Sequence, residues 1–205
     1  MKMEDRSVFI LSLEGIKHVK SEEGDLLTKP FLNVCKLIIP IIDKFGPAMT
    51  IVKLDINSNI SRLESRHKSN PSRFNYLYSL IQAEIETNTA KSSSSCTNAL
   101  LWLTRAIDFL VELLHNLEQH QDWPMSQVYN DSYTKTLKKW HGWLATSSSM
   151  VAIKLAPDKK KFMEVIGTQG DIHGDIQKFC TDFSLITLSI HKFLGSVGLD
   201  NMKTS

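Results

Sequence analysis

Residues 98–119 read NALLWLTRAIDFLVELLHNLEQ, and apolar side chains occupy most of this stretch. At helical spacing they cover most of a helix surface rather than one stripe along it. A helix that is apolar nearly all round has to be covered on both sides. The stretch therefore predicts a central helix in a fold of two packed layers, or a helix that lines an apolar cavity. Ser95 or Thr97 can cap its N-terminus.

The rest of the chain also reads as helices separated by breakers. With 9 Gly and 6 Pro in 205 residues, a turn-rich β sandwich or barrel is disfavoured, and no strand-like alternation stands out. We therefore expect an all-α, two-layer helical sandwich that forms one domain over residues 26–205. Residues 1–25 would be an N-terminal arm that packs on this domain or precedes it. The expected helices cover about residues 31–45, 49–68, 71–88, 98–119, 131–156, 157–166 and 171–197.

Charge and cysteine content exclude several classes of protein. The 24 basic and 22 acidic residues give a net charge of +2, without the basic excess of a nucleic-acid binder. The three cysteines show no CxxC spacing, so neither a disulfide framework nor a zinc site is expected. No apolar run approaches the ~20 residues that span a bilayer. We expect a soluble, cytosolic protein without a metal or cofactor, which would lie on a membrane rather than cross it if it handled lipid.

A polar stripe lies on the expected helix over residues 49–68. Asp55, Asn59 and Arg62 fall at i, i+4 and i+7, beside an apolar face. Together an acid, an amide and a guanidinium can satisfy many hydroxyls on a small polar ligand. Exposed trios of this kind are common, so the spacing alone favours a solvated face with an Asp–Arg interaction.

Two further places could bind a ligand. Trp102 is either ordinary core or a flat platform for a ligand ring, and its apolar surroundings favour core. Residues 138–143, KKWHGW, put two tryptophans, a histidine and a glycine in little more than one helical turn. A helical glycine costs about 1 kcal/mol relative to alanine, which indicates close packing there. His141 could be a core histidine, a donor to a ligand or a metal ligand, but the other histidines supply no metal spacing.

Taken together, these motifs resemble glycolipid transfer proteins. Their order and spacing match across about residues 28–200, and three separated motifs are far more specific than one. The opening GIKHVKSE (residues 15–22) and the closing GLD (198–200) resemble the plant branch of that family. The three matching motifs are VKLDINSNI (52–60) followed by Arg62, LWL (101–103) followed by Arg105, and KKWHGW (138–143), with LAP (155–157) beyond them.

The resemblance implies a lipid pocket between the two layers, with the head-group site at its mouth. Asp55 would accept hydrogen bonds from the sphingoid amide and a sugar hydroxyl, and Asn59 and Arg62 would bind the sugar. Trp102 would stack under the sugar ring, and His141 would donate to the acyl-amide carbonyl. The implied function is non-vesicular transfer of glycosphingolipids of the glucosylceramide type, without covalent chemistry on them.

Several positions depart from the animal members of the family. Arg62 stands where those members have lysine, and Asn98 where they tend to have an apolar residue. Residues 147–149 are serines where bulkier side chains are usual. We expect Asn98 and Leu137 to modify the pocket.

A second group of residues is expected to contact the membrane. Trp143, Leu144 and Lys154 combine an aromatic ring, an apolar chain and a cation on one predicted helix. Such a set favours shallow binding at a bilayer interface.

Three alternatives use the same residues. Transfer of ceramide-1-phosphate would need several cations converging on the phosphate, and Arg105 could add one to Arg62. A lipid sensor would bind the same ligand and signal through a partner protein. A glycosidase would need two carboxyl groups about 5–10 Å apart. Because only Asp55 is expected at the head-group site, and no enzyme motif is present, an enzyme is disfavoured.

Overall fold

The computed structural model describes residues 7–141, 158–166 and 171–203. Within these ranges the chain is helical, and the β-type pairings are two isolated bridges, Lys20 with Leu26 and Leu27 with Tyr76. None of the helices described there is long and apolar enough to cross a membrane. The helices are α1 (Ile10–Ile16), α2 (Thr28–Lys44), the 3₁₀ helix η2 (Gly46–Met49), α3 (Thr50–Ser69), α4 (Leu77–Glu86), α5 (Cys96–Gln119), α6 (Met125–Thr136), α8 (Lys159–Ile166) and α9 (Ile172–Ser196).

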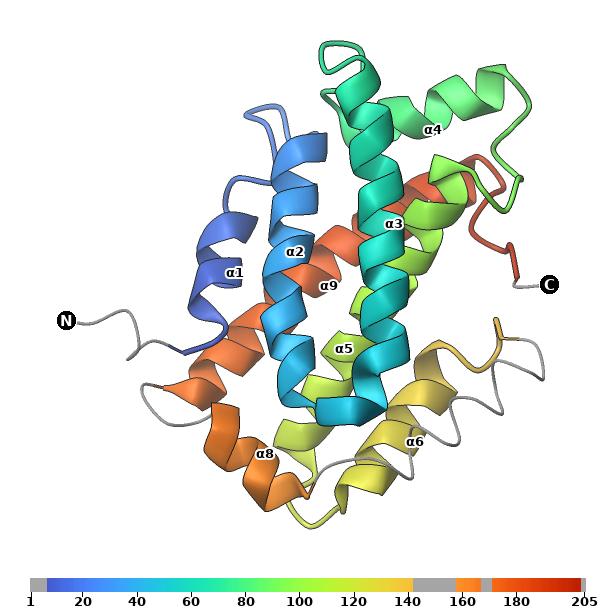
Figure 1. The fold of residues 1–205 in the computed structure, drawn as a ribbon. Helices are drawn as coiled ribbons and strands as arrows, with labels where there is room; N and C mark the ends of the chain where they lie inside the picture. Colours follow the sequence, from blue (N-terminus) through green and yellow to red (C-terminus); the bar gives the residue numbers. More distant parts are fainter. Residues whose placement is uncertain (1–6, 142–157, 167–170, 204–205) are drawn as a thin grey trace.

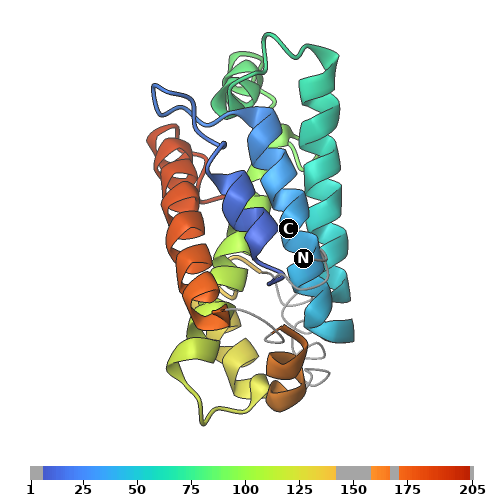
Figure 2. The ribbon, with the colours of Figure 1, turned by 90° about the vertical axis from the view of Figure 1, so that its left-hand side faces the viewer.

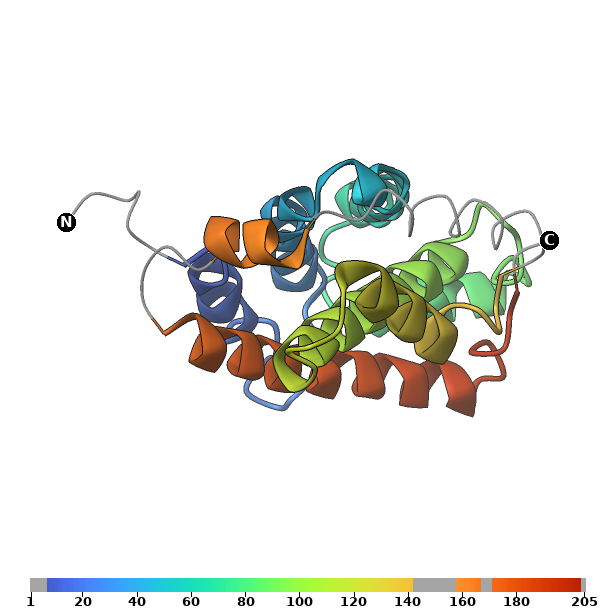
Figure 3. The same ribbon diagram turned by 90° about the horizontal axis from the view of Figure 1, so that it is seen from below.

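The helices form two layers, which Figures 2 and 3 show edge-on. In Figure 1, α2 and α3 lie side by side in front, and α5 and α9 cross behind them. α5 packs against α9 and α6 within its own layer and against α3 of the other, while α1 packs against both α2 and α9. The prediction of an all-α, two-layer fold is confirmed, and the all-round apolar character of α5 follows from its contacts on several sides.

The start of α5 is fixed by two side chains. Ser95 is its N-cap, and the Ser95 Oγ accepts from the Asn98 main-chain N–H at 2.9 Å. Glu84 of α4 accepts from the N–H groups of Cys96 at 2.6 Å and Thr97 at 2.8 Å. A carboxylate here satisfies unpaired amides and complements the positive end of the helix dipole. Of the two predicted caps, the Ser95 cap is confirmed.

The predicted helix boundaries hold at several places and fail at two. α9 covers almost the whole predicted range 171–197 and is capped by Asp171. The helix predicted from residue 71 begins only at Leu77, because residues 71–74 form a turn closed by the bond from the Phe74 N–H to the Asn70 carbonyl. The helix predicted over 131–156 is confirmed for residues 131–136, but both of its boundaries are wrong and residues 137–140 form a turn.

That helix, α6, begins earlier and ends sooner than predicted. Pro124 occupies its N-cap position, where a proline is compatible with a helix start, so α6 begins at Met125. At its end the N–H groups of Leu137 and Lys138 both donate to the Tyr133 carbonyl, at 3.0 Å each. This pairing closes the helix at Thr136. Residues 142–157 of the predicted helix lie outside the described ranges.

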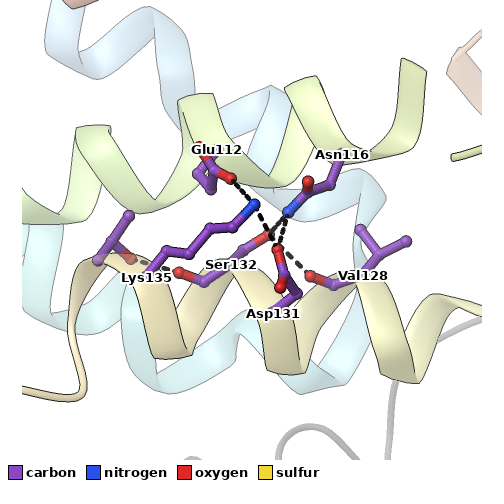
Figure 4. Close-up of polar contacts among 7 residues, drawn as sticks. Glu112, Asn116, Val128, Asp131, Ser132 and Lys135 are labelled. Atoms are coloured by element: carbon purple, nitrogen blue, oxygen red, sulfur yellow. Dashed lines mark hydrogen bonds and ion pairs between the residues drawn. The ribbon is translucent and has the colours of Figure 1, made fainter. Parts of the chain in front are cut away.

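A polar network joins α6 to α5 (Figure 4). Asn116, only 1% exposed, donates from Nδ2 to Asp131 Oδ2 at 2.9 Å and to Ser132 Oγ at 3.0 Å. Lys135 Nζ lies 2.8 Å from both Glu112 Oε1 and Asp131 Oδ2. The bond to Lys135, followed by the bond from Asn116, holds the pKa of Asp131 below its ordinary value. The network orients α6 on α5.

The N-terminal arm contains α1. Its residues Leu13 and Ile16 and the preceding Phe9 are buried, and the Phe9 ring meets Phe179 of α9 edge-on at 5.4 Å between centroids. The described part of the arm thus packs against both layers. The division of the chain at residue 26 stays a prediction.

Candidate functional site

The polar stripe of α3 is partly assembled. Asn59 is buried, at 4% exposure, and its Nδ2 donates to Asp55 Oδ2 at 3.1 Å. Asp55 keeps an exposed edge next to this buried amide. Restricted hydration raises the pKa of Asp55, against the opposing effects of the Asn59 hydrogen bond and the Arg62 charge. The structure therefore joins an acid and an amide, one turn apart, into a single hydrogen-bonding unit.

Arg62 turns toward the loop before α5. Its Nη1 donates to the Ser93 carbonyl at 2.9 Å and to the Ser95 carbonyl at 3.4 Å. The side chain thus ties α3 to the N-terminus of α5, one turn before Asn98. An open groove of about 450 Å³ lies beside it. The residues lining the groove are Arg62, Ser65, Arg66, Ser69, Glu84, Thr89, Ser94 and Cys96.

Trp102 of α5 and His141, which follows the turn after α6, come together. Trp102 is partly buried, and its ring stacks on the His141 imidazole with centroids 5.4 Å apart and planes inclined by 25°. His141 Nδ1 lies 3.2 Å from the Tyr133 Oη. Burial and then the charge of Arg105 lower the pKa of His141, so its imidazole is neutral near neutral pH. When Nδ1 of the neutral imidazole accepts a hydrogen bond from the tyrosine hydroxyl, the ring proton is on Nε2. The Nε2–H group is then a hydrogen-bond donor.

The Arg105 side chain is buried and hydrogen-bonded within the protein. It is 2% exposed, its Nη1 donates to the Met202 carbonyl at 2.7 Å, and its Nη2 donates to the Asp200 carbonyl at 2.6 Å. Its guanidinium carbon lies 3.8 Å from the centroid of the Trp140 ring and 4.9 Å from that of Trp102. Each terminal nitrogen thus donates to a main-chain carbonyl, which ties Arg105 to the C-terminal segment and argues against the alternative in which it adds a second cation to the head-group site.

The two halves of the predicted site lie on helices that pack against each other, α3 with its acid–amide pair and α5 with the indole–imidazole stack. Leu137 is buried in the turn after α6, and Asn98 is half-buried one turn before Trp102. The predicted membrane residues Trp143, Leu144 and Lys154, and the serines 147–149, lie outside the described ranges.

Sequence reasoning missed Tyr133, Glu84 and the hydrogen bonds of Arg105 to the C-terminal segment. Tyr133 reaches His141 across the turn after α6, and Glu84 caps a different helix. Neither contact follows a helical period, so no pattern could have revealed it. Among the residues that the structure describes, no group of three or more His, Cys, Asp or Glu side chains could hold a metal ion.

Two packed helical layers, with the acid–amide pair on α3 and the indole–imidazole stack beside α5, define the class of this protein as an all-α helical sandwich. The family model for glycolipid transfer protein (GLTP) matches residues 26–168. The chain therefore belongs to the glycolipid transfer protein family, a family of non-enzymatic carriers. The resemblance in the sequence motifs is thereby confirmed.

Glycolipid transfer protein 1 of Arabidopsis thaliana is 61% identical to this chain over 199 residues, which are 97% of this chain and 98% of that one. A structure of FAPP2, on how it selects simple glycosphingolipids using the GLTP fold, aligns with a TM-score of 0.86 at 24% identity, over 98% of this chain and all of that one. The apo-form of mouse ceramide-1-phosphate transfer protein aligns with a TM-score of 0.84 at 18% identity, over 97% and 100%. These two structures show that the fold is shared.

Proposed function

We propose that this protein transfers glycosphingolipids with one small sugar, of the glucosylceramide type, between membranes by holding one lipid non-covalently between its helical layers. The high identity to a relative named for glycolipid transfer supports a glycolipid as the cargo. The choice of a neutral sugar over a phosphate has to come from the residues of this chain, because the fold alone serves both kinds of protein.

The observation that supports a neutral sugar most directly is the engagement of Arg105. A phosphate site needs several converging cations. Arg105 is buried, and its two terminal nitrogens donate to the Asp200 and Met202 carbonyls, so its hydrogen bonds hold it on the C-terminal segment rather than at a phosphate. The Asp55 carboxylate of the proposed head-group site would also repel a phosphate. An acid and an amide suit the alternating donors and acceptors of sugar hydroxyls instead.

Each side chain of the proposed site binds a different part of the lipid. Asp55 accepts from the sphingoid amide and a sugar hydroxyl, and Asn59, held against it at 3.1 Å, adds a donor and an acceptor. Arg62 retains donors beyond the nitrogen that binds the loop. Trp102 offers a flat face to the sugar ring, and His141 donates from Nε2 to the acyl-amide carbonyl, a role that its lowered pKa supports because a neutral ring is the form needed.

Transfer itself requires no chemical energy. Moving each CH₂ of a lipid chain from the bilayer into water costs ~0.8 kcal/mol, so spontaneous desorption of a two-chain lipid is slow. An apolar sleeve between the layers removes most of that barrier, and exchange then runs down the concentration gradient. We further propose that the protein acts as a monomer in the cytosol and binds membranes transiently, with Trp143, Leu144 and Lys154 at the contact.

A vesicle assay tests the head group. Donor vesicles carry labelled glucosylceramide, galactosylceramide, lactosylceramide or ceramide-1-phosphate, and the rate of transfer to acceptor vesicles is measured. We expect the single-sugar lipids to move fastest. Preference for ceramide-1-phosphate would overturn the assignment of the head-group site. Binding with negligible transfer would favour a lipid sensor.

Two substitutions test the residues. We expect Trp102→Ala and Asp55→Val each to abolish transfer while the helical content, read by circular dichroism, stays near wild type. Asp182→Val is the matched control, since it removes a half-buried helical carboxylate from α9 that pairs with Lys178, one turn before it on the same helix. Loss of the fold in the first two variants would mean that Trp102 and Asp55 are structural residues and not ligand contacts.

A further inference from the structure

The segment that follows α9 folds back onto α5, and His191 is at the centre of the contact. Its Nδ1 lies 2.5 Å from Asp200 Oδ1, and its Nε2 lies 2.7 Å from Asp108 Oδ2 of α5. A neutral imidazole has one N–H and can donate to one carboxylate, whereas the protonated ring donates to both. The geometry therefore fits a protonated imidazole that bridges α5 and the C-terminal segment.

The same segment is held a second time, through its main chain. The Asp200 and Met202 carbonyls accept the two hydrogen bonds from Arg105, and Leu199 is buried at 3% exposure. The red C-terminal segment passes beside the N-terminal half of α5 in Figure 1. Asp200 thus links two cations, His191 through its side chain and Arg105 through its carbonyl.

Arg105 in turn meets the aromatic part of the candidate site. Its guanidinium lies against the faces of Trp102 and Trp140, and Trp102 stacks on His141. Cation–π contacts strengthen when the guanidinium is desolvated, so they can bias the position of a half-buried ring. A continuous set of contacts therefore runs from His191 to the proposed sugar platform.

We propose that His191, bridging Asp108 and Asp200, is a positioning residue for the head-group site: it holds the C-terminal segment on α5 and so keeps Arg105 against Trp102. This inference rests on the proposed role of Trp102. The residues of the bridge need not touch the lipid, yet they set its affinity, because an Arg105 without its carbonyl partners would leave its position or draw in water.

The bridge makes affinity depend on pH. The charged groups facing the ring are Asp108 and Asp200, with Arg105 next to Asp200. Burial alone would lower the pKa of His191, but the two hydrogen bonds and the two negative charges outweigh it and raise the pKa above its ordinary value. A raised pKa means that the bridge is complete below about pH 6.5 and is lost as the pH rises through the folded-state pKa. Glycolipid affinity should therefore fall on the alkaline side.

The test compares His191→Gln with His173→Gln, a control near the other end of the same helix, where His173 pairs with Glu118 at 2.8 Å and also has a raised pKa. Affinity for glucosylceramide is measured from about pH 6 to about pH 9. We expect His191→Gln to weaken binding by about tenfold at the acidic end and to remove the pH dependence. His173→Gln should bind like the wild type. Faster amide hydrogen exchange in residues 199–202 of His191→Gln should accompany the loss.

Unchanged affinity and an unchanged pH profile in folded His191→Gln would overturn the inference. If that variant does not fold, Asp108→Asn decides instead: removing one facing charge should move the fall in affinity to lower pH, and an unmoved midpoint would refute the bridge. Trp102→Ala is measured in parallel. If it retains affinity, the proposed function fails; if it loses affinity while His191→Gln does not, only the role of His191 fails.

Discussion

The polar network between α5 and α6 predicts that its buried neutral amide contributes more to the free energy of unfolding than its exposed lysine. Asn116→Ala removes the amide that donates to Asp131 and Ser132. A neutral bond is worth about 1 kcal/mol and a bond to a charged group about 1.5–3 kcal/mol. Ser132 keeps its bond to the Val128 carbonyl, and Asp131 keeps Lys135, so no partner is left unpaired. We therefore expect a loss near the lower end of the sum of the two bonds, about 2.5 kcal/mol in the free energy of unfolding.

Lys135→Met is the comparison. Lys135 makes two ion pairs at 2.8 Å, but its side chain is 50% exposed. Exposed pairs of this kind contribute at most about 1 kcal/mol. Urea unfolding followed by circular dichroism measures both variants, and the melting temperature of Asn116→Ala should fall by about 5–10 °C. If Lys135→Met proves as destabilising as Asn116→Ala, the argument that the buried amide dominates this network is refuted.

Three further predictions concern stability. Gly15→Ala would place its Cβ 2.7 Å from the Cγ2 of buried Val34, so the clash should outweigh the helix propensity of alanine and cost about 1–2 kcal/mol in urea unfolding; a more stable variant would contradict the tight packing of α1 on α2. Glu84→Ala should lower the free energy of unfolding by about 1–2 kcal/mol, because the Cys96 and Thr97 N–H groups at the start of α5 lose their acceptor; an unchanged free energy would contradict this. Because His141 has a lowered pKa in the folded protein, the free energy of unfolding should decrease as the pH falls below about 6.5. Urea unfolding at several pH values measures this decrease, and His141→Gln should remove the part that His141 contributes.

Local sequence patterns predicted much of the fold. The spacing of apolar residues along α5 and α9 predicted both helices, since each turn of a helix repeats regardless of what packs on it. The Ser95 cap was recognisable because capping is a short-range hydrogen bond. The end of α6 was not, because Thr136 and Leu137 carry no breaker; the helix closes through two N–H groups that share the Tyr133 carbonyl.

The candidate site likewise contains one contact that the sequence predicts and one that depends on the tertiary structure. The spacing of Asp55 and Asn59 on one helix suffices to bring them within hydrogen-bonding distance, and the structure confirms the contact. The stacking of Trp102 on His141 joins segments 39 residues apart and depended on how α6 and the turn after it lie on α5.

The amino-acid sequence by itself determined that the chain forms amphipathic and all-round apolar helices and that one of them carries an acid–amide pair, because these features repeat with the helical turn. Only the tertiary structure decided that Arg105 is occupied by the Asp200 and Met202 carbonyls and that His191 bridges two carboxylates. Main-chain carbonyls are identical at every residue and leave no mark in the sequence, so their partners become known only when distant segments pack together.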